Sequence, residues 1–124
     1  MKAVTLTIRI TTGLLYSASA AMYFLDMMPE AELSGPTLQF VAGLDAAGYF
    51  MPFLKVIELI GGLALIAGKF VPLATVVLFP VTLNIFLFHA FLAPEGMIIP
   101  ILLLAANLYL AFAYRDRYRP ILQP

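Results

Sequence analysis

The sequence has 124 residues, enough for one domain, and its composition is that of a membrane protein. Hydrophobic residues make up 63% of the chain and charged residues 11%, against about 45–50% and about 25% in ordinary soluble domains. Seven basic residues balance seven acidic ones, and this neutral balance excludes a nucleic-acid binder, which needs basic residues to neutralise phosphates. Because a small soluble domain cannot bury so much apolar surface, a soluble enzyme and a disordered chain are also excluded.

The residue types that carry most metal and redox chemistry are nearly missing from the sequence. There is no cysteine, which excludes disulfides, thiolate metal sites and cysteine nucleophiles. There is one histidine, too few for a multi-histidine metal site within one chain. We therefore expect neither a metal site nor catalytic residues in the chain alone. Whether it contributes to catalysis as a subunit stays open.

Charge-free stretches outline the membrane-spanning segments, because a spanning helix needs about 20 mostly apolar residues. The sequence predicts an all-α membrane protein, with a single four-helix transmembrane domain over residues 1–124. The predicted spans cover residues 5–25, 50–68, 70–91 and 97–114. Pro72 suits the first turn of the third span, where its missing N–H costs nothing. Pro80, in the middle of that span, predicts a kink.

The basic residues predict the orientation in the membrane. With four spans the three basic clusters, which hold six of the seven basic residues, fall on one side, at Lys2, Arg9, Lys69, Arg115, Arg117 and Arg119. The connection over residues 26–49 has no basic residue and carries Asp26, Glu30, Glu32 and Asp45. We therefore expect a multi-pass protein of the inner membrane with both termini in the cytoplasm. The alternative for the N-terminus is a signal peptide cleaved near Ala18-Ser19-Ala20, but the apolar run continues to Leu25.

Residues 37–48 are too few to span a membrane. Leu38, Val41 and Leu44 repeat at helical spacing, which predicts a short amphipathic helix in the first external connection. The alternative is a plain loop.

Polar side chains within the apolar spans are the candidate binding residues, because such groups are expensive in hydrocarbon. Four of them lie at similar depth in the outer half of two neighbouring spans: Lys55, Glu58, Asn84 and His89. Arg9 belongs to the inner half and completes the set. We expect the four outer residues to converge, with Glu58 within hydrogen-bonding distance of at least one polar partner in the set.

Each of these residues also has a simpler interpretation. Lys55 and Glu58, three residues apart on one helix face, could only neutralise each other. Asn84, like Asn107 in the fourth span, could be an interhelical hydrogen-bonding residue. His89 could bond to a carbonyl near the interface, and Arg9 could extend to the inner surface. The small residues are expected to serve close helix packing: Gly13, Ser17, Ala20 and Ala21 in the first span, and Gly61, Gly62, Ala64 and Gly68 in the second.

The second and third spans resemble the DoxX family of small membrane proteins over about residues 48–96. The shared pattern is K-x-x-E-x-x-G-G, a short basic turn, a proline-containing helix and N-x-x-x-F-H. It matches here at Lys55, Glu58, Gly61, Gly62, Pro72, Pro80, Asn84, Phe88 and His89. Arg9 also fits the early arginine of the family. The family's Gly-x-x-Lys near the outer end of the first span is replaced by Tyr23-Phe24-Leu25-Asp26, so a role for that lysine does not carry over.

The resemblance implies a role close to redox chemistry, since members resemble or associate with subunits of membrane-bound oxidoreductase systems. One hypothesis is therefore an accessory subunit with redox-enzyme partners, whose outer polar pocket binds a quinone or another small molecule. Lys55, Asn84 and His89 would supply hydrogen-bond donors beside an apolar slot. The alternatives are a small transporter or lipid-binding protein, and a purely structural or assembly protein. The lipid bilayer is an expected partner, a homo-oligomer stays open, and nucleic acid is not expected.

Overall fold

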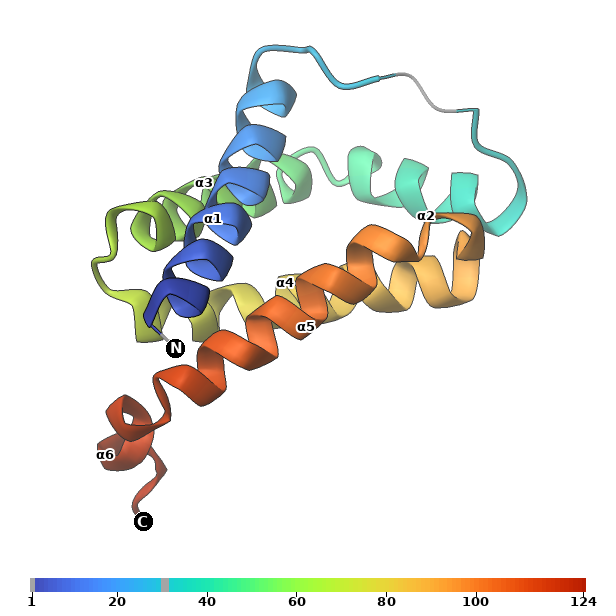
Figure 1. The fold of residues 1–124 in the computed structure, drawn as a ribbon. Helices are drawn as coiled ribbons and strands as arrows, with labels where there is room; N and C mark the ends of the chain where they lie inside the picture. The colour runs from blue at the N-terminus through green and yellow to red at the C-terminus, as the bar shows by residue number, and fades with distance from the viewer. Residues whose placement is uncertain (1, 30–31) are drawn as a thin grey trace.

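The computed structural model describes residues 2–29 and 32–124, and these residues form helices and connections without a strand (Figure 1). The long helices are α1 (Lys2–Phe24), α2 (Gly35–Ala46), α3 (Phe50–Ala67), α4 (Val71–Leu92) and α5 (Ile98–Ala113). Short helical turns follow at η1 (Pro94–Gly96), η2 (Arg115–Tyr118) and α6 (Arg119–Leu122). The all-α fold class predicted from the sequence is confirmed.

Helices α1, α3, α4 and α5 coincide with the four predicted spans to within three residues at each end. By length and composition, α3 and α4 are able to cross a membrane, and α5 joined to the segment after it, across a bend of 71°, is a third candidate. The 23 residues of α1 are long enough, but its threonines, serines and Arg9 make it more polar. Four spans therefore remain a prediction.

The helices pack in the order α1, α3, α4, α5, and α5 returns to touch α1 (Figure 1). The contact between α1 and α3 is the most extensive, and the contact between α5 and α1 is the least extensive of the four. Apolar side chains fill the centre, with polar residues among them. The buried apolar cluster consists of Tyr16, Leu65, Val71, Ala74, Leu78, Leu103 and Leu110.

Small residues allow α1 and α3 to approach closely. A Cβ atom added at Gly62 would lie 2.6 Å from the Ser17 hydroxyl oxygen, and one added at Gly13 would lie 2.8 Å from the side chain of Ile66. The neighbouring Gly61 faces α4 instead, where an added Cβ would meet Leu78 at 2.8 Å. The predicted packing role of these small residues is confirmed, because no larger side chain fits without displacing a neighbour.

The basic ends of the helices gather at one end of the molecule. The Arg9 guanidinium, near the start of α1, lies against Gly68 at the end of α3. The Tyr118 hydroxyl, beyond the end of α5, donates to the carbonyl oxygen of Pro72 at the start of α4, at 3.0 Å. The structure thus places the basic residues of the N-terminus, the α3–α4 turn and the C-terminal segment near one another.

The connection after α1 contains a helix, α2, rather than a plain loop. It packs at the end of α4: the Thr37 hydroxyl donates to the Leu92 carbonyl oxygen at 2.7 Å, and the rings of Phe40 and Phe88 lie 5.5 Å apart. None of its residues is buried, and Leu38 is exposed, so its amphipathic character remains a prediction. Glu30 of the acidic connection lies outside the described residues.

Candidate functional site

An ion pair is buried between α1 and α3. The Lys55 ammonium lies 3.2 Å from Oε2 of Glu58 and donates a hydrogen bond to the Ser19 hydroxyl at 2.9 Å. Lys55 is 8% exposed and Glu58 is 3% exposed. The predicted contact of Glu58 with another polar residue is therefore confirmed, and Lys55 does not extend to the surface.

Local sequence explains why the two charges meet. Lys55 and Glu58 are three positions apart on α3, so their side chains project from the same helix face. That face is turned towards α1, because the glycines one turn further along allow α1 to lie close. Ser19 is on the matching turn of α1 and supplies a short hydroxyl where a larger side chain would displace the ammonium.

A second pair of polar side chains lies beside the ion pair. The hydroxyl groups of Tyr16 on α1 and Thr82 on α4 form a buried hydrogen bond. Thr82 also donates to the carbonyl oxygen of Leu78 at 3.0 Å. Polar contacts thus connect α1, α3 and α4 across the middle of the apolar core.

Sequence reasoning did not select Tyr16, Ser19 or Thr82. Single hydroxyl residues are common in membrane helices, where they bond to their own backbone, so residue type alone gives no signal. Their positions relative to Lys55 and Glu58 depend on the rotation of α1 and α4, which a single sequence does not give.

Asn84 and His89 are not joined to the ion pair by a hydrogen bond among the described residues. Asn84 is exposed on α4. Nδ1 of His89 is 2.9 Å from the Ile85 carbonyl oxygen on its own helix, and the imidazole ring packs edge-on against Phe88. Five residues separate Asn84 from His89, which places them about 140° apart around a helix, so they cannot both face α3. The convergence of all four predicted residues is not observed.

Arg9 lies against Gly68 at the end of α3, away from the ion pair, and its place in the inner half of the membrane stays a prediction. Its Nη1 and Nη2 atoms would lie 3.0 Å from a Cβ at Gly68, whose φ of +72° also favours glycine. Its Nε atom is buried and has no hydrogen-bond partner among the residues that the structure describes. Arg9 is therefore a separate polar site rather than a partner of Glu58.

Asn107 acts between α5 and α4. It is fully buried, and its amide nitrogen donates to the Thr75 carbonyl oxygen at 3.4 Å, a long hydrogen bond. This contact confirms the interhelical role that the sequence suggested for Asn107. Its side-chain oxygen has no partner in the described part of the chain.

The ion pair has an unused hydrogen-bonding capacity. A lysine ammonium carries three N–H donors. Two of them are directed at Glu58 and Ser19, and no third acceptor is found among the described residues. A carbonyl or another acceptor placed beside Lys55 could therefore bind without breaking an existing contact. Within the residues searched, no group of histidine or acidic side chains is suited to a metal ion.

Comparisons with known proteins agree with the pattern found in the sequence. The model of the DoxX family matches residues 4–90, which is more than half of the chain and includes Arg9, Lys55, Glu58, Asn84 and His89. No curated protein and no solved structure gives a significant match. Together with its apolar helices, this match identifies the chain as a multi-pass membrane protein that belongs to the DoxX family.

Proposed function

We propose that this protein is an accessory subunit of a membrane-bound oxidoreductase system, and that the Lys55–Glu58 pair is its functional polar centre. The observation that carries the proposal is the burial of both charges in an apolar helix, with one lysine donor unused. An accessory role also agrees with the composition: no cysteine and one histidine leave few groups for carrying electrons.

Burying the Lys55–Glu58 pair costs free energy, and close packing of the helices does not need charged residues at these positions. Removing two charges from water is expensive, and well-packed apolar residues of similar size are often neutral or stabilising in their place. Ionisable groups inside membrane segments are rare and are candidate sites for binding or for proton transfer. The position of the pair between α1 and α3 therefore supports a role in binding or proton transfer.

A quinone is the small molecule that we propose for this centre. Its carbonyl oxygens need hydrogen-bond donors, and the third N–H of Lys55 would supply one. Its ring and tail need an apolar surrounding, which the apolar side chains of α1 and α3 around the pair would supply. Asn84 and His89 remain part of the proposed binding set only if a ligand or a partner subunit draws them towards Lys55, because they make no contact with it here.

A purely structural role is the second candidate, and the contact of Lys55 with Ser19 favours it. That hydrogen bond of 2.9 Å joins α1 to α3 beside the tightly packed glycines. In this role the pair stabilises the contact between the two helices and does nothing else. A transporter or lipid-binding function, in which Glu58 takes up a proton, is the remaining alternative.

Purification from native membranes in mild detergent separates these roles. An accessory redox subunit should co-purify with an oxidoreductase subunit, and native mass spectrometry should detect a bound quinone that a Lys55→Met variant fails to retain. Proton-coupled flux of a substrate in liposomes would favour the transporter instead. Isolation of a folded chain with neither partner nor bound molecule would leave the structural role.

A further inference from the structure

We propose that the contact line between α1 and α5 binds an anionic phospholipid, with the phosphate held at Lys2 and Arg9 and one acyl chain lying in the groove further along the same helices. This site is separate from the Lys55–Glu58 pair and does not depend on the function proposed for that pair. Two cavities and one hydrogen bond, all between α1 and α5, carry the inference.

The phosphate end is a basic pocket of about 440 Å³. It lies between the first turns of α1 and the end of α5 and is lined by Lys2, Thr5, Leu6, Arg9, Ala113 and Tyr114. Among the described residues, neither Lys2 nor Arg9 takes part in an ion pair. The pocket therefore presents two uncompensated cations beside hydroxyl groups, which suits a phosphate.

Arg9 is held in place with an unused donor. Its guanidinium lies against Gly68, where any larger residue would meet Nη1 and Nη2 at 3.0 Å. Its Nε–H is buried and has no partner among the described residues. A phosphate in the pocket would therefore accept from the terminal nitrogens of the guanidinium, and this charge-assisted contact adds an attraction.

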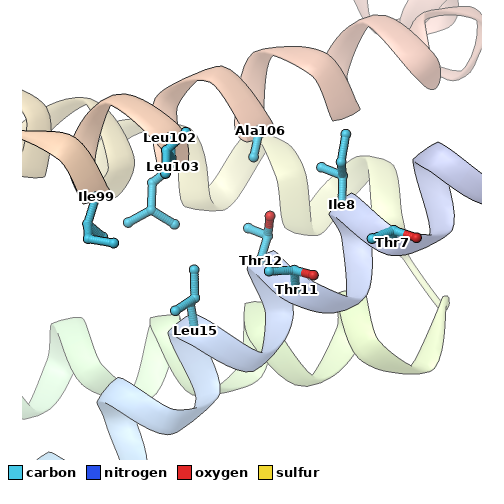
Figure 2. Close-up of a pocket in the computed structure, with 9 residues that line it drawn as sticks. All are labelled: Thr7, Ile8, Thr11, Thr12, Leu15, Ile99, Leu102, Leu103 and Ala106. Carbon is cyan, nitrogen blue, oxygen red and sulfur yellow. The ribbon is translucent and has the colours of Figure 1, made fainter.

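The acyl-chain end is a groove of about 340 Å³ along the same two helices. Figure 2 shows side chains of α1 and α5 facing each other across it, with Thr12 and Leu15 on one side and Leu102 and Leu103 on the other. The remaining lining residues are Thr7, Ile8, Thr11, Ile99 and Ala106. Its surface is mainly apolar, and α1 and α5 are the least tightly packed neighbours in the ring of helices.

The two cavities follow one another along antiparallel helices. On α1 the groove begins at Thr7 and the basic pocket reaches down to Lys2, while on α5 the groove ends at Ala106 and the pocket begins at Ala113. A hydrogen bond of 2.9 Å between the Thr5 and Tyr109 hydroxyls joins the helices between the cavities. This bond closes the contact of α1 and α5 between the two cavities, so a phospholipid that occupies both has to pass beside it, with its headgroup in the basic pocket and an acyl chain in the groove.

A phospholipid fits this arrangement better than a free anion. Basic pockets between membrane helices on the side that carries the positive charges are typical sites for anionic headgroups. An inorganic phosphate would use only the basic pocket and leave the apolar groove unexplained. A neutral hydrocarbon would use only the groove and leave Arg9 without an acceptor.

Native mass spectrometry of the purified full-length protein tests the proposal, with dioleoylphosphatidylglycerol and dioleoylphosphatidylcholine as probes. We expect the anionic lipid to bind more tightly than the zwitterionic one. The double variant Lys2→Gln and Arg9→Gln should bind it at least about twentyfold more weakly, because it loses two charge-assisted hydrogen bonds to the phosphate. The matched control, Arg117→Gln with Arg119→Gln, removes the same charge at the same end but from outside the pocket, so only the general attraction to an anionic lipid falls and binding should weaken several times less.

The groove is tested separately with Ala106→Trp, which fills it, and Ile101→Trp on the exposed side of α5 as its control. Only Ala106→Trp should weaken lipid binding. If Arg9→Gln lowers the melting temperature, the single variant Lys2→Gln serves instead, and it should weaken binding of the anionic lipid by about fivefold. The proposal is overturned if the two double variants lose binding equally or if the two lipids bind equally well. It is also overturned if millimolar inorganic phosphate displaces the lipid or if Ala106→Trp has no effect.

Discussion

A Cβ atom built on Gly13 would lie 2.6 Å from the carbonyl oxygen of Gly62, so α1 and α3 meet backbone to backbone. Two turns further along, the same interface holds the hydrogen bond between Ser19 and Lys55. The close approach of the two helices therefore positions the buried ion pair as well as packing the core. A change that pushes the helices apart is expected to disturb both.

Gly62→Ala should destabilise the protein by about 1–3 kcal/mol, because the new methyl group would meet Ser17 and the Gly13 backbone at less than 3 Å. Thermal unfolding in detergent measures the effect. Gly43→Ala in α2 is the matched control, since an added Cβ there meets nothing within 4 Å. The control should be neutral or slightly stabilising, as alanine is the better helix former. Equal melting temperatures for the two variants would show that α1 and α3 are not closely packed.

Tyr16→Phe should lower the free energy of unfolding by about 1 kcal/mol, the usual contribution of one intramolecular hydrogen bond. Thr82 keeps its bond to the Leu78 carbonyl oxygen, so it is not left without a partner and the loss stays moderate. Tyr49→Phe, at a residue 70% exposed, removes the same atom from the surface and should have no effect. If the Tyr16→Phe protein is as stable as the control, the hydrogen bond between Tyr16 and Thr82 does not contribute to stability.

The distribution of basic residues predicts that both termini are cytoplasmic and that the connection before α2 is external. A reporter fused after residue 124 should behave as cytoplasmic, and one inserted near residue 34 as external. A cytoplasmic signal at residue 34 would contradict this topology. The lower hydropathy of α1 makes this the informative position, because α3 and α4 already satisfy the requirements for spans.

The helices could be predicted from the sequence because charge-free stretches, prolines and glycines mark their limits. Their number as membrane spans could not, because α1 contains several hydroxyl residues and the segment after α5 turns by 71°. The helix α2 was predicted from three apolar residues, yet it packs through Thr37 and Phe40. Periodicity located this helix but did not identify the side that touches α4.

The ion pair could be predicted because Lys55 and Glu58 lie on one helix, where spacing fixes their relation. Contacts between helices depend on rotation about each axis, which a single sequence does not give. For that reason Ser19, Tyr16 and Thr82 were not selected, and Asn84 and His89 were placed beside Lys55. Position along the helices separated Arg9 from Glu58, and the structure places Arg9 at the other end of α3, against Gly68.

The central claim is that the Lys55–Glu58 pair acts in binding rather than only in folding, and the double variant Lys55→Met with Glu58→Gln tests it most directly. Removing one charge leaves the other buried and unpaired, so Lys55→Met alone should cost about 3–5 kcal/mol, whereas the double variant should recover much of that loss. Melting temperature and retention of a short-chain benzoquinone, read by native mass spectrometry, are measured on the same samples. The account predicts a double variant that is folded and stable but no longer retains the quinone. A double variant that recovers stability and retains the quinone as well as the original protein would contradict the account and leave the pair a structural role.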